Sequence, residues 1–453
     1  MMFERKRTMD NVLLARMLFG SSLIFHIIFA TLGVGLTLMI LIAEILRVIR
    51  KDNDYGILAK RWTKAVAILL GVAIPSGTIV AVMLALLWPG FIEVVGQVIA
   101  LPFTLEIFAF FIEALFLSIY VYAASRLSSA MRIISVFFVA LGATASAVLI
   151  TNVQSWMNTP TGFNVVNGQI TDVRPWEAVL NPAFGYTAIH VTSSAYMATA
   201  FVVASVAAYQ LLKPNLKESE KKYHRKGLMV ALVFGAITSL WTATNGHTSA
   251  VGLHHNVPVK LAAAEGLFET QSNAPLAIFG TPDPEANRVV GGIEIPGMLS
   301  FLATGSTDGV VIGLNEFPRD EWPPLFVHTL FNIMVGIGSL LIGLSFGALA
   351  YRIVFKKREY PNWLLIPLIG SGPLAMLGIE TGWIFACIGR QPWTIYGIQR
   401  TAEAATKSAN LGTFFVIFIS LYVFLLVITA LVMRYYFRRN PLINEFDSQT
   451  TSV

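Results

Sequence analysis

Nine apolar stretches, each long enough to cross a lipid bilayer, constrain the fold of this chain more than any other feature. A helix needs about 20 apolar residues to cross the roughly 30 Å of hydrocarbon in a bilayer. With 55% hydrophobic and 13% charged residues, the chain carries more apolar surface than a soluble domain hides. We therefore predict an all-α, polytopic integral membrane protein, a single membrane domain over 1–453 with about nine transmembrane helices. The stretches are 18–47, 62–88, 99–123, 129–153, 184–212, 226–245, 324–354, 362–387 and 410–436.

Lys and Arg are unevenly distributed over the loops between these stretches. The loops at 47–64, 126–132, 213–226 and 352–358 and the tail after 433 hold 21 basic residues, whereas the alternate loops hold 7. Since basic loops stay in the cytoplasm, this bias predicts an outside N-terminus and a cytoplasmic C-terminus. Four basic residues near the N-terminus favour a cytoplasmic N-terminus instead: Arg5, Lys6, Arg7 and Arg16. The larger number of basic residues in the other loops decides the orientation that we predict. Basic residues in such short runs set orientation, so the net charge of +6 does not indicate nucleic acid as a partner.

The longest loop, 246–323, lies on the predicted outer side. Its apolar segment 292–314 is not counted as a span, because Glu294, Pro296 and Asp308 interrupt it. A loop of this length is often the mark of a binding function. The first apolar stretch is too long for the core of a cleaved signal, so we expect a retained first helix.

A single cysteine, Cys387, limits the redox chemistry open to the chain. One cysteine excludes an intramolecular disulfide, a Cys-ligated iron–sulfur cluster and a C-x-x-C-H haem attachment. Any redox cofactor is therefore held without a covalent bond to cysteine.

Five side chains that can bind iron lie in five different spans and, by their places along the helices, at a similar depth. With a rise of about 1.5 Å per residue, all five lie about 9–15 Å below the outer surface. Haem iron takes His, Met or an anionic oxygen as axial ligand, and a helix bundle offers an apolar slot for the macrocycle. The five are His26, Glu106, His190, Met334 and Glu380.

Other interpretations of these residues stay open at this point. An intramembrane His also serves as a hydrogen-bond partner between helices, and most Met residues only pack. Ionisable groups in spans are also typical of a haem-free, proton-coupled membrane transporter, with Glu106, Glu113 and Glu380 as proton carriers. Glu44, near the cytoplasmic end of its span, and His328 are interpreted as interface and packing residues.

Several strings resemble subunit I of cytochrome bd-type quinol oxidases, in order along nearly the whole chain. The long loop is short for that family, which points to its short-loop branch. The strings are Phe25–Ala30 (FHIIFA), Ser155–Pro160 (SWMNTP), Lys260–Glu265 (KLAAAE), Ile333–Gly336 (IMVG), Glu380–Trp383 (ETGW) and Gly389–Trp393 (GRQPW).

The resemblance implies a terminal respiratory oxidase, an electrogenic quinol:oxygen oxidoreductase that oxidises ubiquinol or menaquinol and reduces dioxygen to water without pumping protons. It implies three haems. His190 and Met334 match the axial ligands of a low-spin haem b, and His26, Glu380 and Glu106 match positions at a high-spin haem b paired with haem d or a second high-spin haem b.

The resemblance also assigns roles outside the haem ligands. The loop 246–323 resembles an extracytoplasmic quinol-binding loop, in which Lys260 and Glu265 match implicated residues; a carboxylate suits quinol oxidation because the reaction releases protons. Glu106 and Glu113, seven residues apart, share one helix face, so we expect Glu113 to relay protons outward to Glu106.

Two residues of the GRQPW string carry further expectations. Arg390 is expected to pair with haem propionates, and Trp393 to line the redox site or anchor the interface. One departure from the family stands two residues before Met334, where Asn332 replaces an Arg that many relatives carry.

The resemblance further implies a second membrane subunit, subunit II, and admits a small single-helix subunit, in a bacterial or archaeal plasma membrane. A haem-bearing electron-transfer subunit without oxygen chemistry and the haem-free transporter are the alternatives that we carry forward.

Overall fold

The computed structural model describes residues 2–124, 126–356, 359–408 and 410–450, with side chains described from residue 11 to residue 446 of these ranges. Lys357 and Arg358, which were counted among the inner basic residues, and the side chains of Arg5, Lys6 and Arg7 lie outside that description. The described part is mainly helical and contains nine helices long and apolar enough to cross a membrane, which confirms the sequence prediction.

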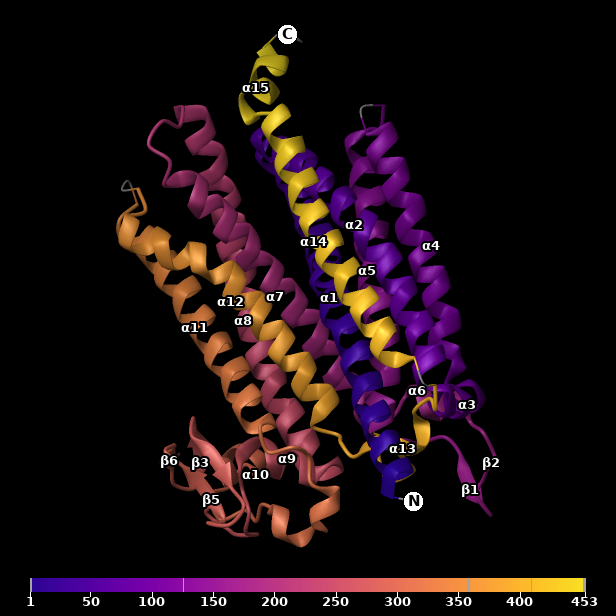
Figure 1. Cartoon of the computed structure of the whole chain (residues 1–453). Helices are drawn as coiled ribbons and strands as arrows, with labels where there is room; N and C mark the ends of the chain where they lie inside the picture. The colour runs from indigo at the N-terminus through magenta and orange to yellow at the C-terminus, as the bar shows by residue number, and fades with distance from the viewer. Residues whose placement is uncertain (1, 125, 357–358, 409, 451–453) are drawn as a thin grey trace.

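The nine long helices follow the predicted stretches closely, and they run side by side through the molecule in Figure 1. Their bounds are α1 Met2–Arg50, α2 Asp54–Leu87, α4 Ala100–Ala123, α5 Ser129–Asn158, α7 Phe184–Leu211, α8 Glu218–Asn256, α11 Val327–Val354, α12 Asn362–Ile388 and α14 Leu411–Arg439.

Short elements lie between the long helices. The short helices are α3 Pro89–Val98, α6 Pro175–Val179, α9 Pro258–Glu265, α10 Met298–Thr304, α13 Thr401–Ala404, α15 Leu442–Thr450 and the 3₁₀ turns Leu314–Glu316 and Arg319–Glu321. The antiparallel strand pairs are β1 Asn164–Val166 with β2 Gln169–Thr171, β3 Leu276–Ile278 with β6 Ile293–Ile295, β4 Thr281–Asp283 with β5 Arg288–Val290, and β7 Trp393–Ile395 with β8 Gln399–Arg400.

Several helices extend beyond the predicted stretches: α1, α2 and α8 begin earlier than predicted, and the end of α8 changes the bounds of the outer loop. The sixth span does not end at residue 245, because α8 continues as a helix to Asn256. Hydropathy falls after residue 245, and the pair Asn245-Gly246 is typical of turns, but no proline interrupts the helix before Pro258 and the helix continues through the pair. The part of the loop that follows α8 therefore begins at residue 257, and segment 292–314 contributes β6 and the short helix α10 instead of a span.

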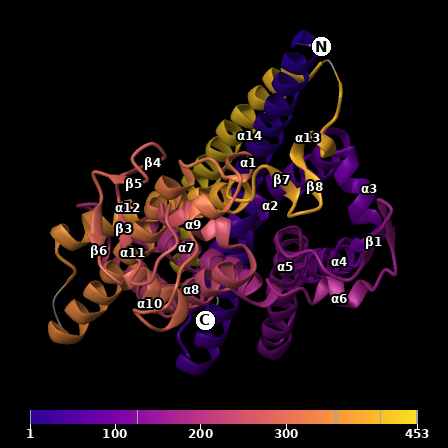
Figure 2. The ribbon, with the colours of Figure 1, turned by 90° about the horizontal axis from the view of Figure 1, so that it is seen from below.

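The helices form two groups that meet along α1, α5 and α7. Helices α1, α2, α4 and α5 pack on one another, as do α7, α8, α11 and α12, and α14 covers α1 and α2. Figure 2 shows the two groups end-on, with the elements of the loop 257–323 beneath the second group. The N-terminus lies at the end of the bundle that carries this loop, and the C-terminus at the other end (Figure 1).

Small residues let α1 and α12 approach α7 closely, as is usual where membrane helices meet. A Cβ placed on Gly35 of α1 would collide with the side chain of Thr199 of α7. Thr199 Oγ1 in turn donates a hydrogen bond of 3.1 Å to Thr31 O. On α12, a Cβ on Gly372 would lie 2.8 Å from Ser205 Cβ, and Ser205 Oγ donates to Ile369 O at 2.6 Å.

We expect Gly35→Ala to destabilise the purified protein, because the new methyl group displaces Thr199 and breaks its hydrogen bond to α1. Overpacking of this kind costs about 1–3 kcal/mol. Thermal unfolding in detergent should show a lower midpoint for Gly35→Ala than for Gly33→Ala, where the nearest atom would lie 3.9 Å from the added methyl group. Equal midpoints for the two variants would contradict this packing account.

Candidate functional site

His26 of α1 lies against α2 with its ring held in one tautomer. Its Nδ1 lies 3.0 Å from Ser76 Oγ, and the Ser76 hydroxyl donates its single proton to Ala73 O at 3.0 Å. Ser76 therefore accepts from His26 Nδ1–H, which leaves the lone pair of Nε2 free. A fixed Nδ1–H donor is the usual arrangement around a metal-binding His. Gly77 makes room for the ring, because a Cβ there would lie 2.9 Å from His26 Cε1.

His190 of α7 faces α8 without a hydrogen-bond partner for its Nδ1 among the described residues. A Cβ on Gly246 of α8 would lie 3.4 Å from His190 Cε1, so a small residue again stands beside the imidazole. Two further buried oxygens, Thr192 Oγ1 on the same helix and Asn245 Oδ1 beside Gly246 in sequence, also lack a described partner. Buried polar atoms are almost always satisfied in native proteins, so the unpaired His190 Nδ1 indicates a bound group.

Met334 of α11 lies against α12, whereas Glu380 of α12 lies on a different side of that helix from the Met334 contact, because the step of two residues from Glu380 to Gly382 turns the helix by about 200°. A Cβ on Gly382 would lie 2.9 Å from Met334 Sδ, which places the thioether against α12 two residues beyond Glu380. Both carboxylate oxygens of Glu380 are buried without a described partner. An unpaired carboxyl group in an apolar interior is costly, and a metal ion is one of the few partners that compensates it.

Glu106 and Glu113 face α5 from α4, as their spacing predicts. Ser146 Oγ donates to Glu106 Oε1 at 3.0 Å. Glu113 is 7% exposed, and Gly142 of α5 packs against its backbone, where a Cβ would lie 2.8 Å from Glu113 N. The two carboxyl groups thus lie two turns apart along one helix contact.

Three strings remote in sequence meet at the loop end of the bundle. Lys260 Nζ donates to Ala386 O of α12 at 3.0 Å and to Asn158 Oδ1 of α5 at 3.3 Å. Gly389 borders the same side chain, since a Cβ there would lie 2.9 Å from Lys260 Cε. The motifs SWMNTP, KLAAAE and GRQPW therefore form one contact, which no spacing argument in the sequence could place.

This contact holds two buried cations. Lys260 and Arg390 are 4% and 6% exposed, and Arg390 Nε and Nη1 have no described partner. Burial lowers the pKa of Lys260 to about 7, with the positive charge of Arg390 as a second cause. Burial also lowers the pKa of Arg390 to about 10. Two cations in one buried place, neither with a carboxylate partner among the described residues, favour an anionic ligand.

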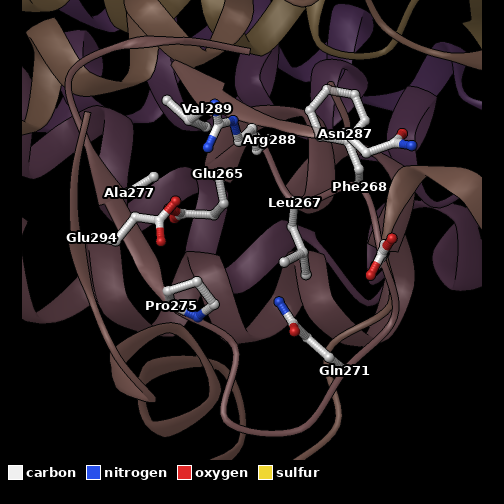
Figure 3. Close-up of a pocket in the computed structure, with 12 residues that line it drawn as sticks. Glu265, Leu267, Phe268, Gln271, Pro275, Ala277, Asn287, Arg288, Val289 and Glu294 are labelled. Atoms are coloured by element: carbon white, nitrogen blue, oxygen red, sulfur yellow. The ribbon is translucent and has the colours of Figure 1, made fainter. Parts of the chain in front are cut away.

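Lys260 and Glu265 do not lie together, although both belong to α9. Five residues at about 100° each place their side chains about 140° apart around a helix. Lys260 contacts α5 and α12, whereas Glu265 lines a cavity of about 240 Å³ between α9 and the strands β3, β5 and β6 (Figure 3). Burial raises the pKa of the Glu265 carboxyl group to about 8.

Trp393 lies half-buried in β7, outside the cluster of buried cations. Its ring faces the guanidinium of Arg400 at 5.1 Å and the ring of Tyr396 at 6.5 Å. The residue is thus part of the β7–β8 hairpin, with Arg400 instead of Arg390 as its cationic neighbour.

Glu44 and His328, which the sequence analysis interpreted as interface and packing residues, both have specific polar contacts. Glu44 does not meet the interface: it is fully buried and accepts hydrogen bonds from Tyr120 Oη at 2.5 Å, Arg132 Nη2 at 2.7 Å and Arg47 Nε at 2.8 Å. His328 Nδ1 and Nε2 lie 2.8 Å from Ala264 O and 3.0 Å from Phe279 O.

The departure at Asn332 also has a structural role. Asn332 Oδ1 accepts from Phe279 N at 3.0 Å, and its Nδ2 donates to His328 O at 3.0 Å. Together with His328 it ties the outer loop to the first turns of α11, two residues from Met334.

The sequence reasoning missed the residues that support the ligand candidates. They share a small side chain inside a span, a signal that is too common to single them out. They are Ser76, Gly77, Ser146, Gly246 and Gly382.

Among the described residues, no three His, Cys, Asp or Glu side chains gather as ligands of a metal ion. The candidate ligands each stand alone or in pairs. Such donors suit a metal whose remaining ligands come from a prosthetic group, as in haem.

Comparison with known proteins agrees with this geometry. Residues 14–441 match the family described as cytochrome bd terminal oxidase subunit I. The chain is 58% identical over 433 residues to a putative cytochrome bd menaquinol oxidase subunit I of Bacillus subtilis, covering 96% of this chain and 98% of the relative. It is 29% identical over 443 residues to the cytochrome bd ubiquinol oxidase subunit 1 of the same organism, covering 95% and 93%.

A solved structure is similar over nearly the whole chain. The bd oxidase from Geobacillus thermodenitrificans superposes with a TM-score of 0.89 at 43% identity, covering 95% of this chain and 99% of the other. The fold and these matches define the class of the chain as a membrane-embedded respiratory oxidase. More particularly, the chain belongs to the cytochrome bd terminal oxidase subunit I family, and its curated relatives are quinol oxidases.

We expect Gly77→Val to lower the haem content of the purified oxidase, because the new side chain takes the space of the His26 ring. Gly71→Val on the same helix should leave the haem content unchanged, since nothing lies within 4 Å of its Cβ position. Haem extraction per mole of protein gives the measurement. Full haem content with an unaltered spectrum in Gly77→Val would show that the His26 ring is not needed where it lies.

Proposed function

We propose that this subunit oxidises membrane quinol at its outer loop and reduces dioxygen to water through three haems, and that it builds a proton gradient without pumping. The proposal assigns His190 and Met334 to a low-spin haem b. It assigns His26, Glu380 and Glu106 to a high-spin haem b and a neighbouring haem d or second haem b. When bound, the haems supply electron transfer and the reduction of oxygen.

The observation that carries this proposal is a set of buried polar atoms without hydrogen-bond partners. His190 Nδ1, both oxygens of Glu380 and two nitrogens of Arg390 lack a hydrogen bond within the described residues. Leaving such groups unpaired in a water-free interior costs about 1–3 kcal/mol each and more for charged groups. A haem fits all three kinds of group at once, because its iron binds a His or a carboxylate and its propionate groups bind a guanidinium.

Arg390 and Lys260 fit the carboxylate substituents of a haem. Both cations are buried, and the described acceptors of Lys260 are neutral groups, so the pair leaves an unbalanced positive charge. Carboxylates bound there raise the pKa of Lys260 back toward its ordinary value, because opposite charges favour the ionised form.

Glu265 is proposed as the acceptor of protons from quinol. The raised pKa of about 8 places it close to the working pH, where a general base is most effective. Lys260 does not assist it directly, since the two side chains leave α9 in different directions. The proposed contribution of Lys260 is instead to bind, together with Arg390, the carboxylate groups of a haem.

Protons for oxygen reduction are proposed to come from the cytoplasmic side through Glu113 and Glu106. Glu106 holds its hydrogen bond to Ser146, and Glu113 lies deeper along the same contact of α4 with α5. Electrons enter from quinol on the outer side, and the protons of quinol leave there. Charge is therefore separated by the opposite origins of electrons and protons, without a pump.

The orientation and partners follow from the same proposal. The outer loop and the N-terminus face the outside of a bacterial or archaeal plasma membrane, and the C-terminus faces the cytoplasm, as the positive-inside rule predicts. As a subunit I, the chain works with a second membrane subunit. A small single-helix subunit is a further proposed partner.

A reduced-minus-oxidised visible spectrum of the purified complex, with extraction of the haems, tests the proposal. Met334→Leu and His190→Ala should each lose the low-spin haem b signal and quinol oxidation, because either change removes an axial ligand. Met376→Leu on α12 should keep both. A haem d signal would identify the third haem as haem d, and signals of haem b alone would identify it as a second high-spin haem b.

Two outcomes of that measurement would overturn the proposal. A colourless protein would favour the proton-coupled transporter, with Glu106, Glu113 and Glu380 as carriers. Full haem content without oxygen consumption on quinol would favour an electron-transfer subunit that lacks oxygen chemistry.

We further expect Glu113→Gln to slow oxygen reduction while the haem spectra stay unchanged, because the amide cannot carry a proton. A loss of about 100-fold is typical for a group that transfers protons in the rate-limiting step. Oxygen uptake with excess quinol measures it, and Glu93→Gln on the exposed side of α3 serves as control. Undiminished oxygen uptake in Glu113→Gln would remove this residue from the proton route.

A further inference from the structure

The cavity beside Glu265 contains polar residues that the quinol chemistry above does not use. Figure 3 shows the side chains of Glu265 and Glu294 pointing toward each other in this cavity, with Arg288 close above Glu265. Glu294 belongs to β6 and pairs with Ala277 of β3, another lining residue. Glu294 and Arg288 are both exposed, so the cavity connects a buried carboxyl group with the surface of the loop.

Glu265 is aimed into this cavity, and the chain around it is held in place. The residue is only 5% exposed, and burial is what raises the pKa of its carboxyl group. Gly266 ends α9 in the left-handed conformation, with φ of 68°, which favours glycine. On the other side His328 contacts Ala264 O at 2.8 Å, so the backbone is fixed both before and after Glu265.

The size of the cavity decides what it holds. Its volume of about 240 Å³ is below the roughly 300–1,000 Å³ of typical small-molecule sites. A water molecule takes about 30 Å³ in the liquid, so the cavity accommodates several waters. A cavity of this size, lined by polar side chains and with space for water, suits proton transfer better than binding of the quinol ring.

We propose that this cavity is the exit for protons released by quinol, with Glu294 receiving them from Glu265 and passing them to the outer aqueous phase. The inference rests on the proposed function and deepens it. Each quinol gives up two electrons and two protons. Glu265 takes up a proton as a carboxylate, passes it to Glu294, and returns to the carboxylate form for the next proton.

Arg288 is the single cation among the described residues that line this cavity. An opposite charge favours the ionised form of a facing carboxylate, so Arg288 favours release of the proton from Glu265. Glu269 also lines the cavity, and His328 lies behind Gly266, where a Cβ would be 3.5 Å from its Nδ1. Together with Glu294, these three groups are the charged or titratable groups that line the cavity or border the chain at Glu265.

The test uses the purified oxidase complex and compares Glu294→Gln with Glu285→Gln. Both changes remove one negative charge from the same strand region, but Glu285 does not line the cavity. We expect Glu294→Gln to lower kcat for quinol oxidation about five- to tenfold with unchanged KM and haem spectra. The loss is smaller than for a group that contacts the substrate, because water partly replaces the relay.

Further readouts separate proton exit from a structural effect. Glu294→Gln should increase the solvent deuterium isotope effect on kcat, and Glu294→Asp should restore the rate. Oxygen reduction driven by an artificial one-electron donor, which bypasses quinol, should stay at the parent rate. If Glu294→Gln does not assemble, Arg288→Gln takes its place, and we expect it to shift the rise of kcat with pH to higher pH.

The failure of this inference is distinct from the failure of the proposed function. Parent kcat and isotope effect in Glu294→Gln, together with lost quinol oxidation in Glu265→Gln, would overturn the exit route and leave the quinol role of Glu265 in place. Parent activity in Glu265→Gln with all haems present would instead remove Glu265 from quinol oxidation, and the exit route with it.

Discussion

The cost of an unpaired polar group in a water-free interior governs this structure. Most buried polar side chains in the described part obey the constraint locally, as Glu44 does by accepting from a tyrosine and two arginines. His190, Glu380 and Arg390 are among the exceptions, and they come from different elements of the second helix group or its loop end. The need to pair every polar group in a water-free interior thus explains why the spans are helical, and unpaired groups indicate where a bound group lies.

Small residues give these donors their positions. Gly77 and Gly382 each border a candidate ligand from a neighbouring helix at distances where a Cβ would crowd it, and a Cβ on Gly246 would reach van der Waals contact with His190. Close helix contact and ligand placement are therefore one property of the bundle. A larger residue at these positions changes both the packing and the site, which links stability to cofactor binding.

The sequence predicted the spans well, because they rest on a local signal, and the candidate ligands, which stay a prediction, rest on a local signal too. Apolar length predicts spans, and an ionisable residue inside a span is informative by itself. Relations across elements were predicted less well. Lys260 and Glu265 are close in sequence but diverge around α9, and the partners of Lys260, Asn158 and Ala386, lie 102 and 126 residues away in sequence.

The end of α8 shows the same limit from another side. Hydropathy marks where a helix leaves the bilayer, not where its hydrogen bonds stop, so residues 246–256 were assigned to the loop although they continue the helix. This extension matters for function, because it carries Gly246 alongside His190 and leads directly into α9 through Pro258. The loop residues Lys260 and Glu265 thus follow directly on the helix that borders His190, so the position of α9 depends on the same helix contact that places the His190 ring.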